Sequence, residues 1–473
     1  MAAVKGFIAS LLIRRSPKIT RTIKIHKFSL ERVVMSGYIF SNRFLGCYDF
    51  GFQTIEINND DTRRSISQLE DIISVSNPCE LSNSDFEIYK TYRHEVTHLL
   101  DSTATLWGME YTLRMHRWFN EKNDNNLSVL SLNDAEIQMH NHLLCDLKMN
   151  AHHYKINYSL EYNIGCGVFV RFHYLSLKNE RIISVPITML GLLEGHAYAQ
   201  EQLMAHNVYL KKGDVVSNIL LEKQVEMDLK NLSTTEYSCF TALIYQLFPW
   251  LSFKKKMELM IFSAKFSLNV PGFMMGAIPL RLLEHIFPSG PADYICSLKM
   301  EMSRGMHRST FCLIVLLYLA MHSETTELIT ESKGFNDLEK IALDIFPKSI
   351  VDVGLETIYE LEFNPLIDHL KNIGAFLAEN ISAQLVGKSW YLVEFEKIYL
   401  PSITLSSGEI VTPSNSIDFD VDGHINLMLG SVAELNTKIK EYGVVRQHLR
   451  PEIYQDMVSK INGGFNGIVF YPD

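Results

Sequence analysis

Two histidines four residues apart, His94 and His98, lie within a segment whose sequence predicts an α-helix. A capping-box pattern at residues 84–87 marks its expected start, and the helix should continue through IYKTYRHEVTHLLD. Side chains four apart in a helix lie on one face, so both imidazoles can reach one ion. Apart from Glu95, the residues between and just after the pair carry no charge: Val96, Thr97, Leu99 and Leu100. We therefore expect a fold that buries this helix and brings further ligands to it.

Glu95 follows the first histidine and completes the pattern HExxH. On a helix it projects beside the position that two histidines and one more ligand leave open on a tetrahedral metal. A carboxylate there can take a proton from the attacking water and later pass it to a leaving amine. The metal supplies the other half of the chemistry, because it lowers the pKa of water and polarises a carbonyl. The motif therefore predicts a Zn²⁺ site at which Glu95 is the general base of peptide-bond hydrolysis.

The segment TYRHEVTHLLD resembles the active-site helix of the zincin metallopeptidases. In that superfamily the helix packs under a small sheet, and a third protein ligand comes from further along the chain. The likeness covers this helix and, as topology only, residues 20–210. More loosely, HEVTHLLDSTATLWG is similar to the active helix of the Lit-type phage-exclusion peptidases, which cleave the translation elongation factor Tu. That second likeness implies a phage-defence protease directed at one host protein.

The third ligand is expected to be Glu194, in the segment PITMLGLLEGHAYAQE. A carboxylate at the end of an apolar run on a buried helix needs a cation or donors to offset its desolvation. Gly191 and Gly195 lie in the same helix, where each glycine costs about 1 kcal/mol relative to alanine. They indicate that another backbone approaches closely. The pattern resembles the glutamate-bearing helix of gluzincin peptidases.

Other groups stay open as the third ligand. After His98 the chain lacks the glycine-led turn to a third histidine that metzincins have. Asp101 shares the helical face, but three ligands from one straight helix fit a tetrahedral metal poorly, so we expect it to support a ligand. Three further side chains could replace or support Glu194: Glu110, His196 and Glu201. Alternatively, Glu194 pairs with an arginine, Arg171 or Arg181, instead of a metal.

The predicted elements indicate an α+β, predominantly helical protein. Residues 20–59 are rich in β-branched and aromatic residues and predict short strands before the motif helix. Helices are predicted at 109–120 and 134–149, and residues 153–177 predict a strand hairpin. Pro186 is expected in the first turn of the helix that carries Glu194. We expect a zincin-like metallopeptidase domain over residues 1–210, with the active-site helix beside a small sheet.

The rest of the chain predicts two further regions. Apolar residues recur at helical spacing after the turn at 211–214, which predicts a helical domain over residues 211–385. Residues 386–473 mix strand-like pieces with one helix at 432–442, and predict a small α+β C-terminal region. The helical domain carries no chemistry of its own, so we expect it to recognise a protein partner or to cover the cleft.

Charge and cysteine usage limit the partners and the compartment. The formal charge is −10, which argues against nucleic-acid binding, because that needs cationic side chains to displace counterions. The seven cysteines are scattered without a CxxC pair, which favours a reducing, cytoplasmic location and argues against a cysteine-built zinc site. The longest apolar run, 311–321, is shorter than the roughly 18 to 20 residues that span a bilayer, and it predicts a buried core helix. We expect a soluble protein with no membrane association; the sequence gives no oligomeric state.

The sequence leaves two functional hypotheses. In the first, the protein is a zinc peptidase acting on a protein or peptide, with His94, His98 and Glu194 holding the metal and Glu95 as base. In the second, it is a catalytically silent zincin-fold scaffold or regulatory protein with a structural zinc. Glu95 favours the first hypothesis, because a structural site needs no base beside an open coordination position.

Overall fold

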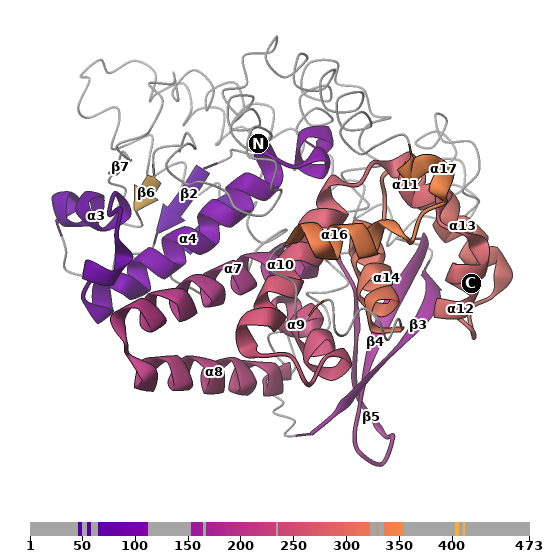
Figure 1. The fold of residues 1–473 in the computed structure, drawn as a ribbon, viewed down its shortest axis with the longest axis horizontal. Helices are drawn as coiled ribbons and strands as arrows, with labels where there is room; N and C mark the ends of the chain where they lie inside the picture. The colour runs from indigo at the N-terminus through magenta and orange to yellow at the C-terminus, as the bar shows by residue number, and fades with distance from the viewer. Residues whose placement is uncertain are drawn as a thin grey trace, which may run out of the picture.

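The computed structural model describes a helical protein with two small sheets (Figure 1). The described residues are 46–49, 54–57, 65–111, 153–163, 167–232, 235–321, 329, 335–352, 403–405 and 410–411. Within them the expectation of a predominantly helical α+β protein is confirmed. The helices predicted at 134–149 and 432–442 lie outside the described residues, and so does most of the predicted helix at 109–120.

The motif helix is α4 (Asn83–Thr103), which continues past the predicted segment by two residues. Its N-cap is Ser82 and not Ser84, so the predicted capping box is wrong by two residues. Ser82 has extended backbone dihedrals, and its hydroxyl oxygen accepts a hydrogen bond from the amide of Asp85. Ser84 instead lies inside the first turn. From Glu95 onward every residue of α4 is buried, including the two acidic residues Glu95 and Asp101.

A four-stranded sheet lies beside α4, in the strand order β1-β2-β6-β7. The antiparallel pair β1 (Gly46–Asp49) and β2 (Thr54–Ile57) packs against the helix. The strand β6 (Ile403–Leu405) runs parallel to β2, and β7 (Ile410–Val411) is antiparallel to β6. Strands were predicted in both segments, but their pairing across almost the whole chain was not. The sheet that supports the motif helix is thus built from both ends of the described chain.

The second sheet is an antiparallel meander of three strands, β3 (Lys155–Asn163), β4 (Gly167–Leu175) and β5 (Arg181–Pro186). The predicted hairpin is confirmed as β3 and β4. Pro186 is the last residue of β5, so its expected place in a helix is wrong. The helix starts three residues later, because the Thr188 side chain accepts a hydrogen bond from the amide of Gly191 and caps it.

The long helix α7 (Met189–Lys212) lies alongside α4 and also packs against α8 (Val215–Lys230), α9 (Thr235–Leu247) and α10 (Phe253–Asn269) (Figure 1). It ends at Gly213, whose φ of 68° is left-handed and favours glycine. The turn predicted at 211–214 is therefore confirmed. Because α7 contacts both the motif helix and the helical half, it connects the sheet-supported site to the larger core.

Shorter helices complete the fold, the first two ahead of α4 and the others in the helical half. They are α3 (Ile66–Ile73), η1 (Pro78–Glu80), α11 (Gly272–Ala277), α12 (Leu280–Ile286), α13 (Ala292–Met302), α14 (Arg308–Met321), α16 (Phe335–Leu343) and α17 (Lys348–Val351). The apolar run at 311–321 lies in α14, whose first ten residues are all buried, so its expected place in the core is confirmed. Among the described helices, none combines the length and apolar character needed to cross a membrane.

Candidate metal centre

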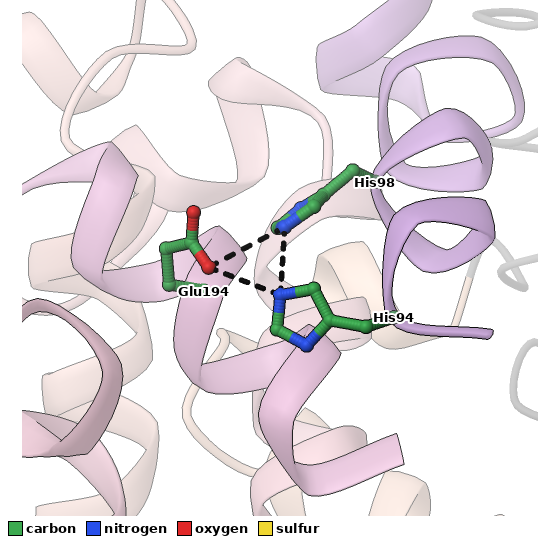
Figure 2. A group of neighbouring side chains, drawn as sticks. All are labelled: His94, His98 and Glu194. Atoms are coloured by element: carbon green, nitrogen blue, oxygen red, sulfur yellow. Dashed lines mark hydrogen bonds and ion pairs between the residues drawn. The ribbon is translucent and has the colours of Figure 1, made fainter. Parts of the chain in front are cut away.

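Helices α4 and α7 bring together His94, His98 and Glu194, which point toward one another (Figure 2). The Nε2 atoms of the two histidines are 3.2 Å apart. One carboxylate oxygen of Glu194, Oε2, lies 3.2 Å from Nε2 of His94 and 3.4 Å from Nε2 of His98. The three side chains form a group that could hold a metal ion. The structure thus brings together all three predicted ligands, although 100 residues separate His94 from Glu194.

The charge of the buried Glu194 is compensated by the two histidines. Burial would raise the pKa of its carboxyl group, but the neighbouring His98 and His94 outweigh burial and lower that pKa to about 2. For His94 burial instead opposes protonation, yet the hydrogen bonds of this ring to Glu194 and Glu201 raise its pKa well above the usual value. The two carboxylates thus favour a positive charge at His94, and a divalent cation bound here would supply that charge in place of the proton.

The other ring nitrogen of His94 is held by Glu201, which lies two turns after Glu194 on α7. Nδ1 of His94 is 3.2 Å from a Glu201 carboxylate oxygen. Lys90 Nζ lies 3.5 Å from the other oxygen of Glu201, and the Gln202 side-chain amide donates to it at 3.2 Å. A carboxylate that accepts from Nδ1 fixes the ring orientation and leaves Nε2 to act as a ligand. Of the two roles predicted for Glu201, the structure therefore places it as a support.

Comparison of this chain with protein-family models, curated proteins and solved structures gave no match. The likeness of the motif segment to zincin peptidases therefore remains a prediction from the sequence. What the site can do has to be inferred from the chemistry of its own side chains.

Glu95 is buried next to the three-residue group, with 5 % of its surface exposed. Burial is the largest influence on its carboxyl group and raises the pKa to about 7, although the neighbouring His94 and His98 act in the opposite direction. A carboxyl group with a pKa near neutral can both accept and return a proton at physiological pH. A pKa in this range is what the predicted role of general base would require of Glu95.

Tyr48 of β1 closes the side of His98 that faces the sheet. Its ring is stacked on the His98 ring, with centroids 6.5 Å apart, and its hydroxyl group is 2.6 Å from the Ser102 hydroxyl. The sequence analysis missed both Tyr48 and Lys90. Lys90 could have been found, since it lies one turn before His94 on the same helical face. Tyr48 carried no such signal, because its contact depends on the docking of β1 against α4.

The alternative ligands lie outside the group. Asp101 is buried and accepts a hydrogen bond from Nδ1 of His196, whose distances to the two carboxylate oxygens are 2.8 and 3.0 Å. Glu110 lies 3.4 Å from the guanidinium group of Arg308, on the side of the helical half. Arg171, predicted as an alternative partner of Glu194, pairs at 2.7 Å with Glu161 on the neighbouring strand.

Proposed function

We propose that the protein is a zinc-dependent peptidase in which His94, His98 and Glu194 hold Zn²⁺ and Glu95 is the general base. The observation that carries this proposal is the triangle of three donor atoms, with sides of 3.2, 3.2 and 3.4 Å. Ligands at about 2.0–2.1 Å from a tetrahedral ion are separated by about 3.3 Å, whereas neighbouring ligands of an octahedral ion at that distance are about 2.9 Å apart. The triangle fits a tetrahedral ion with one position open.

The donor set also favours zinc. Two imidazole nitrogens and one carboxylate oxygen suit zinc and other transition metals, whereas magnesium and calcium prefer oxygen ligands throughout. With neutral histidines and an ionised Glu194, a bound dication keeps one net positive charge. Zinc held in this way would supply the Lewis acid that lowers the pKa of water and polarises a carbonyl.

In the proposed reaction Glu95 moves the proton. Its carboxylate takes a proton from the attacking water as the oxygen bonds to the carbonyl carbon. It then gives this proton to the amide nitrogen as the carbon–nitrogen bond breaks, so that water and a peptide become a carboxylic acid and an amine. Glu201 meanwhile keeps the His94 ring in place through Nδ1.

The position of β1 favours an extended peptide as substrate. Among the described strands, β1 is the end strand of its sheet and pairs only with β2. It also packs against α4, the helix that carries Glu95. An extended peptide can add to such an edge through backbone hydrogen bonds, which would bring its carbonyl groups close to the motif. The cysteines whose side chains are described, Cys79, Cys239, Cys296 and Cys312, are free thiols, in keeping with the proposed cytoplasmic location.

Burial of the ligands favours a second candidate function, a silent scaffold with a structural zinc. The side chain of His98 is 1 % exposed and that of Glu194 is 3 % exposed, as expected for a closed structural site. The two functions differ in what they require of Glu95. A structural site does not need its carboxylate, whereas hydrolysis does.

The variant Glu95→Gln tests the proposal. We expect the purified variant to contain as much zinc as the wild type and to lose peptide hydrolysis, because the amide cannot accept the proton. Proteins from cells expressing the wild type should contain new N-termini that are missing with Glu95→Gln and are retained with Glu258→Gln, a carboxylate on α10. A single cleaved protein would support the proposed host-directed or phage-defence protease. Identical fragment sets from wild type and Glu95→Gln would refute the peptidase proposal.

A further inference from the structure

The backbone of β1 lies against α4 at Gly46, beside the proposed general base. A Cβ atom built on Gly46 would lie 2.8 Å from Oε1 and 3.0 Å from Cγ of Glu95. It would also lie 2.7 Å from the Cγ2 methyl group of Thr91. Distances under 3.0 Å are essentially never seen for real Cβ atoms. The Glu95 side chain therefore occupies space that any other residue at position 46 would fill.

The backbone conformation does not explain this glycine. Gly46 is absent from the described glycines with positive φ, which are Gly167, Gly213 and Gly305. It is part of a regular antiparallel pair, opposite Ile57. An alanine could adopt the same strand geometry. The demand for glycine at this position comes from the side chains of α4 that lie against it.

The same strand contacts the motif at two points on one side. Residues two apart in a strand project to the same face, and Tyr48, two residues after Gly46, stacks on His98. On α4, Thr91 and Glu95 are one turn apart and both lie against Gly46. The helix thus turns one face, with Thr91 and Glu95, toward β1, and presents its histidines to Glu194 of α7.

We propose that Gly46 is a positioning residue that keeps the Glu95 carboxylate where it can transfer protons. This inference rests on the proposed peptidase function, because it gives Glu95 a role in hydrolysis. The substitution Gly46→Ala would be accommodated most cheaply by rotation of the Glu95 and Thr91 side chains, since the clashing atoms belong to side chains and not to backbone. The metal ligands are not among the clashing atoms, so they would stay in place.

The kinetic test uses the zinc-loaded full chain and a fluorogenic peptide that the wild type cleaves, selected from a mixed-sequence library. We expect Gly46→Ala to lower kcat about 100-fold, the scale on which a misplacement of about 1 Å acts, with little change in KM. Zinc stoichiometry and affinity, measured by competition with a chromophoric chelator, should match the wild type. A wild-type kcat, or loss of zinc together with kcat, would overturn the inference.

Two further variants separate the contact with Glu95 from general damage. Thr91→Ser removes the Cγ2 methyl group and keeps the hydroxyl group that donates to the Glu87 carbonyl. In the double variant Gly46→Ala/Thr91→Ser the clash with Thr91 is gone but the clash with Glu95 remains. Its kcat should therefore be as low as that of Gly46→Ala alone, and restoration of kcat would contradict the inference. Gly276→Ala on α11 adds a clash with Ser303 instead, so it should lower the melting temperature and leave kcat unchanged. An equal loss of kcat in Gly276→Ala would also contradict it.

A crystal structure of Gly46→Ala tests the positioning without any assay of activity. The inference predicts that the Glu95 carboxylate is displaced while His94, His98 and Glu194 keep their arrangement. If β1 moves away and Glu95 stays in place, the inference is wrong. If the wild type cleaves nothing but Glu95 is displaced in the variant, the proposed function fails and the steric account of Gly46 holds.

Discussion

Glu201 offers the clearest test of how the site is supported, because it contacts a ligand without being one. We predict that Glu201→Gln weakens zinc binding about 10-fold. Removal of a carboxylate that supports a ligating histidine weakens metal affinity by about 10- to 100-fold, or 1.4 to 2.7 kcal/mol. The lower end applies here for two structural reasons. The contact with His94 is long, at 3.2 Å, and Lys90 at 3.5 Å already offsets part of the Glu201 charge.

The substitution is nearly isosteric, so the amide oxygen can still accept the hydrogen bond from Nδ1 of His94 and only the charge is lost. Zinc affinity is measured by competition with a chromophoric chelator at one pH and salt concentration. Glu258→Gln is the control, since its carboxylate pairs with surface lysines on α10. Glu194→Gln provides the scale for the loss of a true ligand, which should exceed 100-fold. An affinity equal to the wild type, or a loss as large as that of Glu194→Gln, would refute the supporting role.

Three further predictions follow from the same geometry. Zinc affinity should fall as the pH is lowered through the pKa of His94, because a proton then competes with zinc for Nε2. The hydrogen bonds of His94 to Glu194 and Glu201 raise this pKa. Calorimetry over a pH series measures the affinity, and an affinity independent of pH would contradict the prediction. Asp101→Ala should lower the thermal midpoint and cost about 2 kcal/mol, because it leaves the buried Nδ1 donor of His196 without its acceptor. A melt unchanged from the wild type would show that the pair adds no stability. Removal of zinc with a chelator should lower the melting temperature, and re-addition at about 100 times Kd should restore about 2.7 kcal/mol of stability. Equal melting temperatures with and without zinc would show that no zinc binds the folded state.

The helical spacing of the motif predicted which side chains of α4 join the candidate metal site, but it did not predict the surrounding fold. His94, Glu95 and His98 are fixed by local helix geometry, which the sequence states directly. Glu194 was found from a second local signal, a charge at the end of an apolar run, because such a charge needs compensation once buried. Each signal lies within one helix, the motif in α4 and the buried charge in α7, and the structure packs these two helices side by side.

The features that the sequence did not predict depend on contacts between distant segments. The pairing of β6 with β2 joins residues almost 350 positions apart, such as Ile55 and Ile403. The sequence of a strand this short does not specify which other strand it pairs with. The contact of Asp101 with His196 likewise requires the crossing of α4 and α7. The misplaced helix starts have a smaller cause. Ser82 and Thr188 are the caps. Nearby, Ser84 matched the preference for an N-cap and Pro186 matched the preference for proline in a first turn.

The central claim is that three side chains from α4 and α7 converge on one zinc ion and leave one position open beside Glu95. Diffraction data from zinc-loaded crystals, collected on both sides of the zinc absorption edge, test it most directly. We predict one anomalous peak at about 2.0–2.1 Å from Nε2 of His94, Nε2 of His98 and Oε2 of Glu194, with no fourth protein ligand. A peak at another place, or a fourth protein side chain on the metal, would contradict the account.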